Sequence, residues 1–149
     1  MTLFFCSCAI PVPTVKMKVT SPYIRGRVID CESGLSVYHA KVRFEGREFD
    51  FVFTDNDGKF FMEKQKDLVL LHVYTPCPVY DFPTPRKHPG ALIVTLEGYK
   101  ELKLPLKPYY DERNQKMLER AKRGENVDYS KERDKLEILL NDICIEQNG

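Results

Sequence analysis

The chain has 149 residues, of which 42% are hydrophobic and 30% are charged, enough for one domain with a substantial core. Its 23 basic and 22 acidic residues nearly cancel, which argues against binding of nucleic acid through a basic surface. The sequence contains no run of eighteen apolar residues, so it predicts no membrane-spanning helix. Its eight tyrosines and nine phenylalanines are typical of a sheet-rich core.

The N-terminus reads MTLFFCSCAIPVP, a short apolar stretch followed by two cysteines and prolines. It resembles the last part of a bacterial lipoprotein signal, in which small residues precede a cysteine that is lipidated. Cys8 follows the small Ser7 and is the better acceptor, although Phe5 matches the third position before it poorly. The basic region is missing and the apolar region is too short to act alone. A lipid anchor at Cys8 is therefore one expectation, and an apolar tail without that role is the alternative.

Residues 9–22 hold three prolines among small and polar residues, which predicts a tether. Residues 1–22 are thus expected to be an anchor region and tether, and residues 23–149 a single domain.

Alternation of apolar and polar residues begins at Tyr23 and predicts strands. In YIRGRVID, Ile24 and Val28 lie on one side and Arg25 and Arg27 on the other. After a turn at CESGLSV, the alternation resumes in YHAKVRFEG and continues in REFDFVFT, which places its phenylalanines on one face.

The stretch TDNDGKFF then joins two such runs through four turn-forming residues, 55–58. We predict a hairpin tip there, with the flanking phenylalanines contributing to the core: Phe51, Phe53, Phe60 and Phe61. The stretch is missing the spaced oxygen ligands and the closing glutamate of a twelve-residue calcium loop.

Residues 67–75, DLVLLHVYT, are nearly all apolar and predict a central strand covered on both faces. Residues 76–90 contain five prolines and are expected to be a surface loop, too long for a simple connector. Residues 91–96 and 100–106 predict two further strands around a corner at Glu97-Gly98-Tyr99.

Residues 107–135 are predicted to be an insert that carries a short exposed helix, capped by Asp111 and ended by Gly124. The pairs Glu112–Lys116 and Glu119–Arg123 would support this helix. Residues 136–145 fit either a strand or a helix for which Ser130 provides a cap, and their isoleucines favour the strand. About seven or eight short strands with turn signals between them predict an all-β sandwich with loops inserted at 76–90 and 107–135.

The order of these motifs resembles the carboxypeptidase regulatory-like domain, a transthyretin-like Greek-key β-sandwich of about seven strands. The matching positions lie between Tyr23 and Leu106 and are Gly26, Val28, Asp30, Gly34, Ala40, Val42, Thr54, Gly58, Phe60, Gly98 and Tyr99. The two inserts are longer than a minimal domain of this kind needs, and the likeness says nothing about them. Related folds include hydrolases of a urate product that end in Tyr-Arg-Gly-Ser, whereas this chain ends in IEQNG.

Candidate catalytic and metal-binding residues are few. The histidines, His39, His72 and His88, lie apart in the sequence, so neither a metal site nor a cofactor is predicted. Among Cys31, Cys77 and Cys144 no C-x-x-C spacing occurs and at most one disulfide can form, with the pairing left open and free thiols as the alternative. Cys77 is the most exposed candidate nucleophile, but no base accompanies it. The acids of the insert, interleaved with lysine and arginine, indicate a solvated surface.

Aromatic residues around the two inserts are the candidate binding residues: Tyr74, Tyr80, Phe82, Tyr109 and Tyr110. Exposed, such rings suit stacking on sugars or holding a peptide, and the alternative is that they pack the loops onto the sandwich. We therefore expect a non-enzymatic cell-envelope module, an interaction or structural lipoprotein at the periplasmic face of a membrane. Its partner would be an envelope protein or glycan. The alternatives are a carbohydrate- or peptide-binding module, a metal-dependent enzyme that uses the 76–90 loop, or a cytoplasmic domain.

Overall fold

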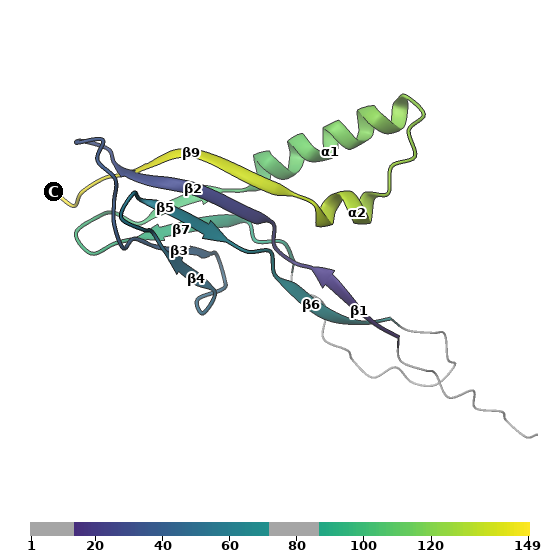
Figure 1. The fold of residues 1–149 in the computed structure, drawn as a ribbon, viewed down its shortest axis with the longest axis horizontal. Helices are drawn as coiled ribbons and strands as arrows, with labels where there is room; N and C mark the ends of the chain where they lie inside the picture. The colour runs from purple at the N-terminus through teal and green to yellow at the C-terminus, as the bar shows by residue number, and fades with distance from the viewer. Residues whose placement is uncertain (1–13, 72–86) are drawn as a thin grey trace, which may run out of the picture.

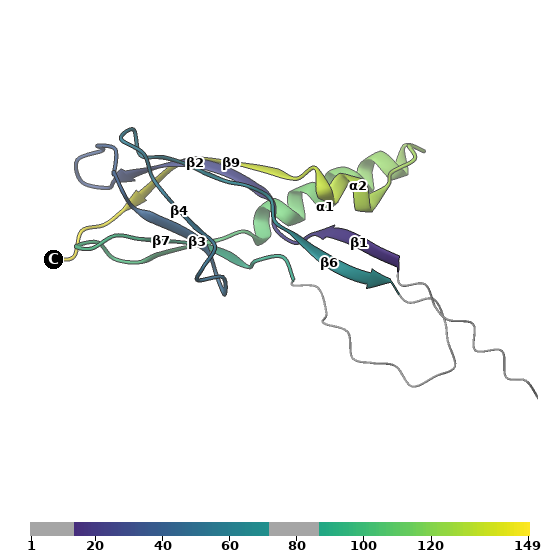
Figure 2. The same cartoon turned by 60° about the horizontal axis from the view of Figure 1, so that its bottom comes forward.

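The structure, a computed structural model, describes residues 14–71 and 87–149. Two sheets pack face to face, as Figures 1 and 2 show. One has the strand order β5-β2-β9, formed by Lys59–Met62, Tyr23–Asp30 and Glu137–Ile145. The other has the order β4-β3-β7-β8, formed by Phe51–Phe53, Lys41–Phe44, Ala91–Thr95 and Leu102–Pro105. The predicted all-β sandwich of about seven strands is confirmed.

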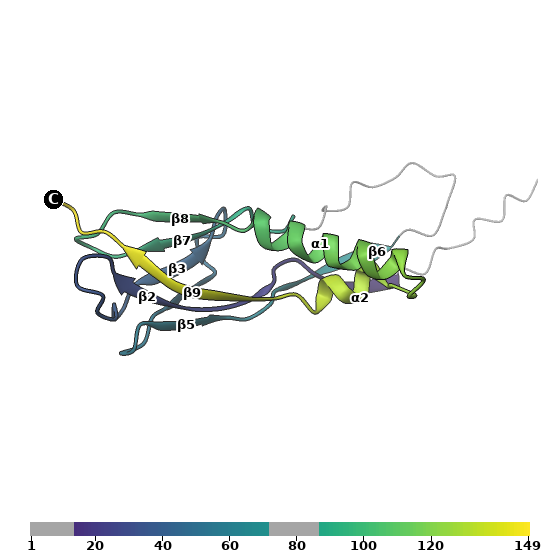
Figure 3. The ribbon, with the colours of Figure 1, turned by 90° about the horizontal axis from the view of Figure 1, so that it is seen from above.

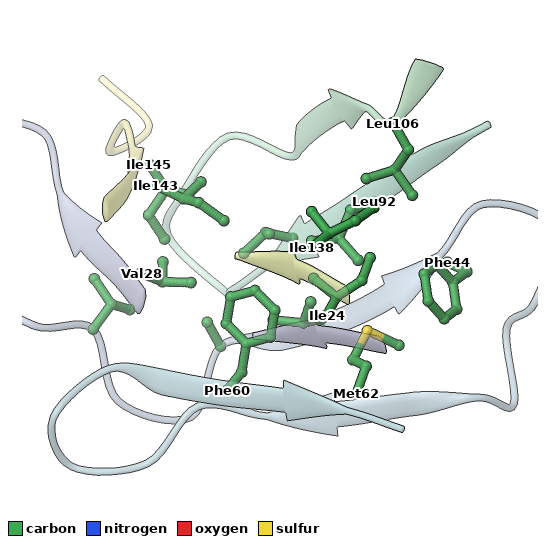
Figure 4. Close-up of a cluster of buried hydrophobic side chains, with 14 residues drawn as sticks. Ile24, Val28, Phe44, Phe60, Met62, Leu92, Leu106, Ile138, Ile143 and Ile145 are labelled. Atoms are coloured by element: carbon green, nitrogen blue, oxygen red, sulfur yellow. The ribbon is translucent and has the colours of Figure 1, made fainter. Parts of the chain in front are cut away.

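The core lies between these two sheets, because alternate residues of each strand point inward. Phe44 is the largest fully buried side chain, and Ile24 and Val28 of β2 are also fully buried. Figure 4 shows how side chains from both sheets meet: Ile24, Val28, Phe44, Phe60, Met62, Leu92, Leu106, Ile138, Ile143 and Ile145.

The stretch TDNDGKFF is a connection between sheets, so the predicted hairpin is wrong. β4 pairs with β3, whereas β5 pairs with β2 in the opposite sheet. The expectation for the flanking phenylalanines is also wrong in part: Phe60 is buried, but Phe51, Phe53 and Phe61 are 40–45% exposed. Val52 is the residue of β4 that packs against the core, because period-2 alternation turns its two neighbours outward.

Side-chain and backbone hydrogen bonds fix this connection. The Asp55 carboxylate accepts from the backbone N–H groups of Asp57 and Lys59 at 2.9 and 2.8 Å. The buried Thr54 hydroxyl accepts from Ala40 N–H at 2.9 Å and donates to Val37 C=O at 2.7 Å. The Asp55 carboxylate therefore stabilises the turn itself, whereas in a calcium loop it would bind the cation.

A third, two-stranded sheet extends away from the sandwich (Figure 1) and joins β1 (Thr14–Val19) to β6 (Lys66–Leu71). Residues 14–19, assigned to the tether from sequence, thus form a strand. β6 pairs only with β1 within the described residues, so the prediction of a central strand is wrong over residues 67–71, and residues 72–75 of that prediction lie outside the described residues. An apolar run alone predicts a strand but not its place in a sheet.

The helical insert is confirmed, with different ends. α1 spans Lys107–Lys122, and α2, Tyr129–Asp134, follows it; in Figure 3 both lie toward the side of the β1–β6 ribbon. The N-cap is Leu106, not Asp111, because Pro108 fits the first turn, where no N–H is needed. Asp111 instead lies inside α1 and pairs with Lys107.

Two other sequence-based features of α1 are present. Gly124 follows its C-cap with φ +83°, and Glu112 pairs with Lys116 at 2.6 Å. Arg123 pairs with Glu125 at 3.0 Å rather than with Glu119. Among the helices that the structure describes, none combines the length and apolar character needed to cross a membrane.

The last segment forms a strand, as the isoleucines favoured. β9 runs parallel to β2, with a register shift between Arg25 and Arg27. The two strands bring together the cysteines that the sequence left unpaired: a disulfide joins Cys31, just after β2, to Cys144 in β9.

Candidate binding surface

A shallow groove with a volume of about 690 Å³ crosses the outer face of the β5-β2-β9 sheet. We call it the outer groove; its lining residues are Arg25, Gly26, Arg27, Phe53, Asp55, Lys59, Phe60, Phe61, Leu139 and Leu140. It follows from the alternation along β2, which buries Ile24 and Val28 and turns Arg25 and Arg27 outward.

Gly26 lines this groove with its backbone, because its side-chain position falls on the side of β2 that holds Ile24 and Val28. A Cβ at this position would lie 3.0 Å from both the Phe60 Cζ and the Leu140 Cβ. The missing side chain therefore leaves room for the Phe60 ring and for β9 at its register shift.

The cations of the outer groove are held by exposed partners. Arg25 Nε lies 3.3 Å from Glu137 and Lys59 Nζ lies 3.6 Å from Asp57. Arg27 donates to Ser36 Oγ at 2.6 Å and to Asp57 C=O at 3.0 Å. Exposed ion pairs of this kind contribute roughly 0–1 kcal/mol each, so another carboxylate can compete for them.

A row of exposed aromatic side chains adjoins the groove at Phe53. This aromatic strip consists of Tyr38, His39, Phe51 and Phe53, whose neighbouring rings contact one another, and Phe49 precedes it in the chain, just before β4. The His39 and Phe53 rings stack with centroids 4.2 Å apart, and Lys41 Nζ lies 4.2 Å above the Phe51 ring. Phe49 is 94% exposed, so at least this ring has no structural use in the described fold.

The alternation along β4 indicates this surface, in the opposite sense to the expectation for its phenylalanines. Phenylalanines at every second position of β4 were expected to face the core. The weaker signal was Val52, whose neighbours must point the other way if it faces inward.

The predicted binding residues lie elsewhere. Tyr109 and Tyr110 are half-buried and pack against the core from α1. The Tyr110 hydroxyl donates to Pro89 C=O at 3.0 Å, and burial raises its pKa to about 12. Tyr74, Tyr80 and Phe82, the lipidation candidate Cys8, and Cys77 lie outside the described residues.

The histidines do not come together in the described part of the chain. His39 is exposed in the aromatic strip, His88 lies near Tyr110 with ring centroids 5.6 Å apart, and His72 falls outside the described residues. Over residues 14–71 and 87–149, no group of three or more His, Cys, Asp or Glu side chains is placed to hold a metal ion.

The end of the sandwich nearest the C-terminus is organised by Asp30, which is 3% exposed. Its carboxylate accepts from Ser33 N–H at 2.8 Å, Gln147 Nε2 at 2.9 Å, the Tyr99 hydroxyl at 2.9 Å and Glu32 N–H at 2.9 Å. These donors hold the Asp30 pKa well below its usual value of 3.8. The hydrogen bond from the Tyr99 hydroxyl to Asp30 also raises the pKa of Tyr99.

Asp30→Asn is expected to destabilise the protein at neutral pH, because the side-chain NH2 of the asparagine would face N–H and O–H groups that are themselves hydrogen-bond donors. Because the folded-state pKa of Asp30 is depressed, its stabilisation is present above the unfolded value near 3.8 and is lost as the pH falls below that value. Thermal unfolding from pH 7 to pH 2 should show the Tm difference between wild type and variant shrinking below that value. Tyr99→Phe, which removes one donor, should give a smaller difference; a Tm difference that is constant with pH would contradict the role of the carboxylate.

Comparison with known proteins finds no matching family model, no similar curated protein and no similar solved structure.

Proposed function

We propose that this chain is a non-enzymatic interaction module of a cell envelope, held at the periplasmic face of a membrane by a lipid on Cys8. The observation that carries the proposal is the exposed surface formed by the outer groove and the aromatic strip. Contiguous apolar surface is costly to leave in water, and such patches mark interaction sites.

The Cys31–Cys144 disulfide supports the proposed location on the periplasmic side of a membrane. Both cysteines are exposed, and such disulfides persist in oxidising environments such as the bacterial periplasm, whereas cytosolic thiols are kept reduced.

The anchor is supported by the position of Cys8 in the sequence. It precedes β1, which leads through Thr20–Pro22 into β2. A lipid there would hold the sandwich close to the membrane and leave the outer face of β5-β2-β9 available to a partner. One acyl chain alone gives weak anchoring, which is why lipoproteins carry more than one.

Thiol trapping in the protein's own cells tests the compartment. Cells are quenched in acid and alkylated before and after reduction, and the Cys31 and Cys144 peptides are weighed by mass spectrometry. We expect alkylation only after reduction. In parallel, palmitate labelling should be lost in Cys8→Ser. Alkylation of both cysteines without reduction, or labelling that survives Cys8→Ser, would contradict the proposal.

A further inference from the structure

We infer that the outer groove binds an extended acidic peptide segment of a partner protein, in which carboxylates alternate with apolar side chains. The inference rests on the proposed function and specifies the chemistry of its partner.

The shape of the surface fits an extended chain. A second groove of about 360 Å³ shares Arg25 and Phe61 with the outer groove and continues toward Lys135 and Leu136. Because they share these residues, the two grooves form one shallow track along the β5-β2-β9 sheet. An open track of this kind suits a ligand that is long and narrow rather than compact.

The charges of the track favour an anion. The side chains that line it include five cations, Arg25, Arg27, Lys59, Lys64 and Lys135, and three carboxylates, Asp55, Asp134 and Glu137. Three of the cations also pair with acids outside the lining, at distances of 3.6–3.8 Å: Arg27 with Asp142, Lys59 with Asp57 and Lys135 with Glu132. The Asp55 carboxylate accepts two amides of its own turn, and Glu137 lies beside Arg25. Arg25 contacts Glu137 through Nε, and within the described residues its other two nitrogens have no ion-pair partner. They are placed to meet a ligand carboxylate.

The edge of β5 offers backbone hydrogen bonds. Gly58 C=O accepts from Val28 N–H, so Gly58, Phe60 and Met62 direct their backbone groups toward β2. Phe61 therefore directs its N–H and C=O away from β2, at an edge where no described strand pairs. A peptide added there as a strand would gain these bonds. Because its side chains alternate, it would turn all its carboxylates toward Lys59 and Arg25 and all its apolar side chains to the opposite face.

The apolar part of the track discriminates between anionic ligands. Phe61 packs edge-on against Tyr23 with ring centroids 4.4 Å apart, and Leu139, which is 57% exposed, lies on the other side of Arg25. The side chains that line the outer groove offer cationic donors, and their one carboxylate, Asp55, already accepts two backbone amides, whereas sugar hydroxyls need donors and acceptors together. The carboxylate side chains of a peptide, with their apolar CH2 stems, match this lining better than a glycan does.

Fluorescence anisotropy with a labelled seven-residue peptide that alternates glutamate and valine tests the inference on the full chain. We expect saturable binding that weakens as salt is raised. Two comparison peptides probe the chemistry: one has lysine in place of glutamate, and one has the same residues in block order. Both should bind about tenfold more weakly or worse.

Variants locate the binding. Arg25→Glu and Phe61→Ser should each weaken binding about tenfold, and the milder Arg25→Gln should weaken it less. Lys122→Glu makes the same charge change as Arg25→Glu on the exposed face of α1 and should leave binding unchanged. Circular dichroism and Tm identify any variant that has failed to fold.

Equal binding of the block-ordered or lysine peptide would overturn the inference, as would binding unaffected by both Arg25→Gln and Phe61→Ser. An oligoglucuronate, or phosphatidylglycerol vesicles, that bound more tightly than the peptide and lost affinity in Arg25→Glu would also overturn it. Those results would leave the proposed function standing, because thiol and lipid state test that separately.

Discussion

Loss of the Cys31–Cys144 disulfide should lower the free energy of unfolding by about 4 kcal/mol. The two cysteines are 113 residues apart, so the bridge closes most of the chain into one loop and restricts the unfolded state. It also joins β2 to the end of β9, a strand placed far from β2 in the sequence. Thermal unfolding of the Cys31→Ala/Cys144→Ala variant should show a Tm about 10 °C lower than wild type.

The control uses a reductant. A dithiol reductant should lower the wild-type Tm toward that of the double variant, because it reduces the Cys31–Cys144 disulfide. It should leave the Tm of the double variant unchanged, because that variant has no such disulfide. Because both cysteine side chains are exposed, alanine leaves no cavity that would confuse the comparison. A Tm for the double variant within about 2 °C of wild type would mean that β9 is held by its other contacts alone.

Gly58→Ala should cost about 3 kcal/mol or more. Gly58 has φ +72°, where a side chain is strained, and a Cβ there would lie 2.4 Å from the Val28 carbonyl oxygen. Avoiding that contact requires the backbone to move, which weakens the 2.8 Å bond from Val28 N–H to Gly58 C=O. Urea unfolding measures the loss as a lower midpoint at unchanged slope.

Two other glycines show how much of the Gly58→Ala loss comes from backbone strain and how much from the close contact with β2. Gly34 and Gly46 have φ +69° and +74°, and a Cβ at either would meet nothing within 4 Å. Gly34→Ala and Gly46→Ala should therefore cost only the backbone term, about 1–2 kcal/mol. Equal losses for all three variants would show that the close approach of Gly58 to β2 does not contribute.

Alternation in the sequence was enough to predict strands and an all-β sandwich, because side chains of a half-buried strand must alternate. It could not predict which sheet each strand joins. Turn residues at 55–58 look the same whether the chain returns along its own sheet or crosses to the other one, and here it crosses. The same limit applies to β6, whose apolar run pairs with a segment that prolines had marked as a tether.

Features that depend on distant residues were beyond the sequence. The disulfide required knowing that β9 lies beside β2, and three cysteines left the pairing open. Conversely, two of the motif residues, Asp30 and Tyr99, were identified separately, and they meet at 2.9 Å at one end of the sandwich.

The candidate binding surface was missed for a related reason. The alternation along β2 correctly predicts that Arg25 and Arg27 lie on the solvent side of a strand, but a single strand does not reveal a groove. The groove needs Phe61 from β5 and Leu139 from β9 on either side of β2. The aromatic residues near the two loops were the predicted binding residues, whereas three of the exposed rings, Phe51, Phe53 and Phe61, stand on β4 and β5.

The most direct test is an amide chemical-shift titration of the full chain with the glutamate–valine peptide. The account predicts saturable shifts at Arg25, Phe53, Phe61 and Leu139, with the amides of α1 unchanged. Shifts that centre on α1, or no shifts at peptide concentrations that saturate the anisotropy signal, would contradict binding at the outer face of β5-β2-β9.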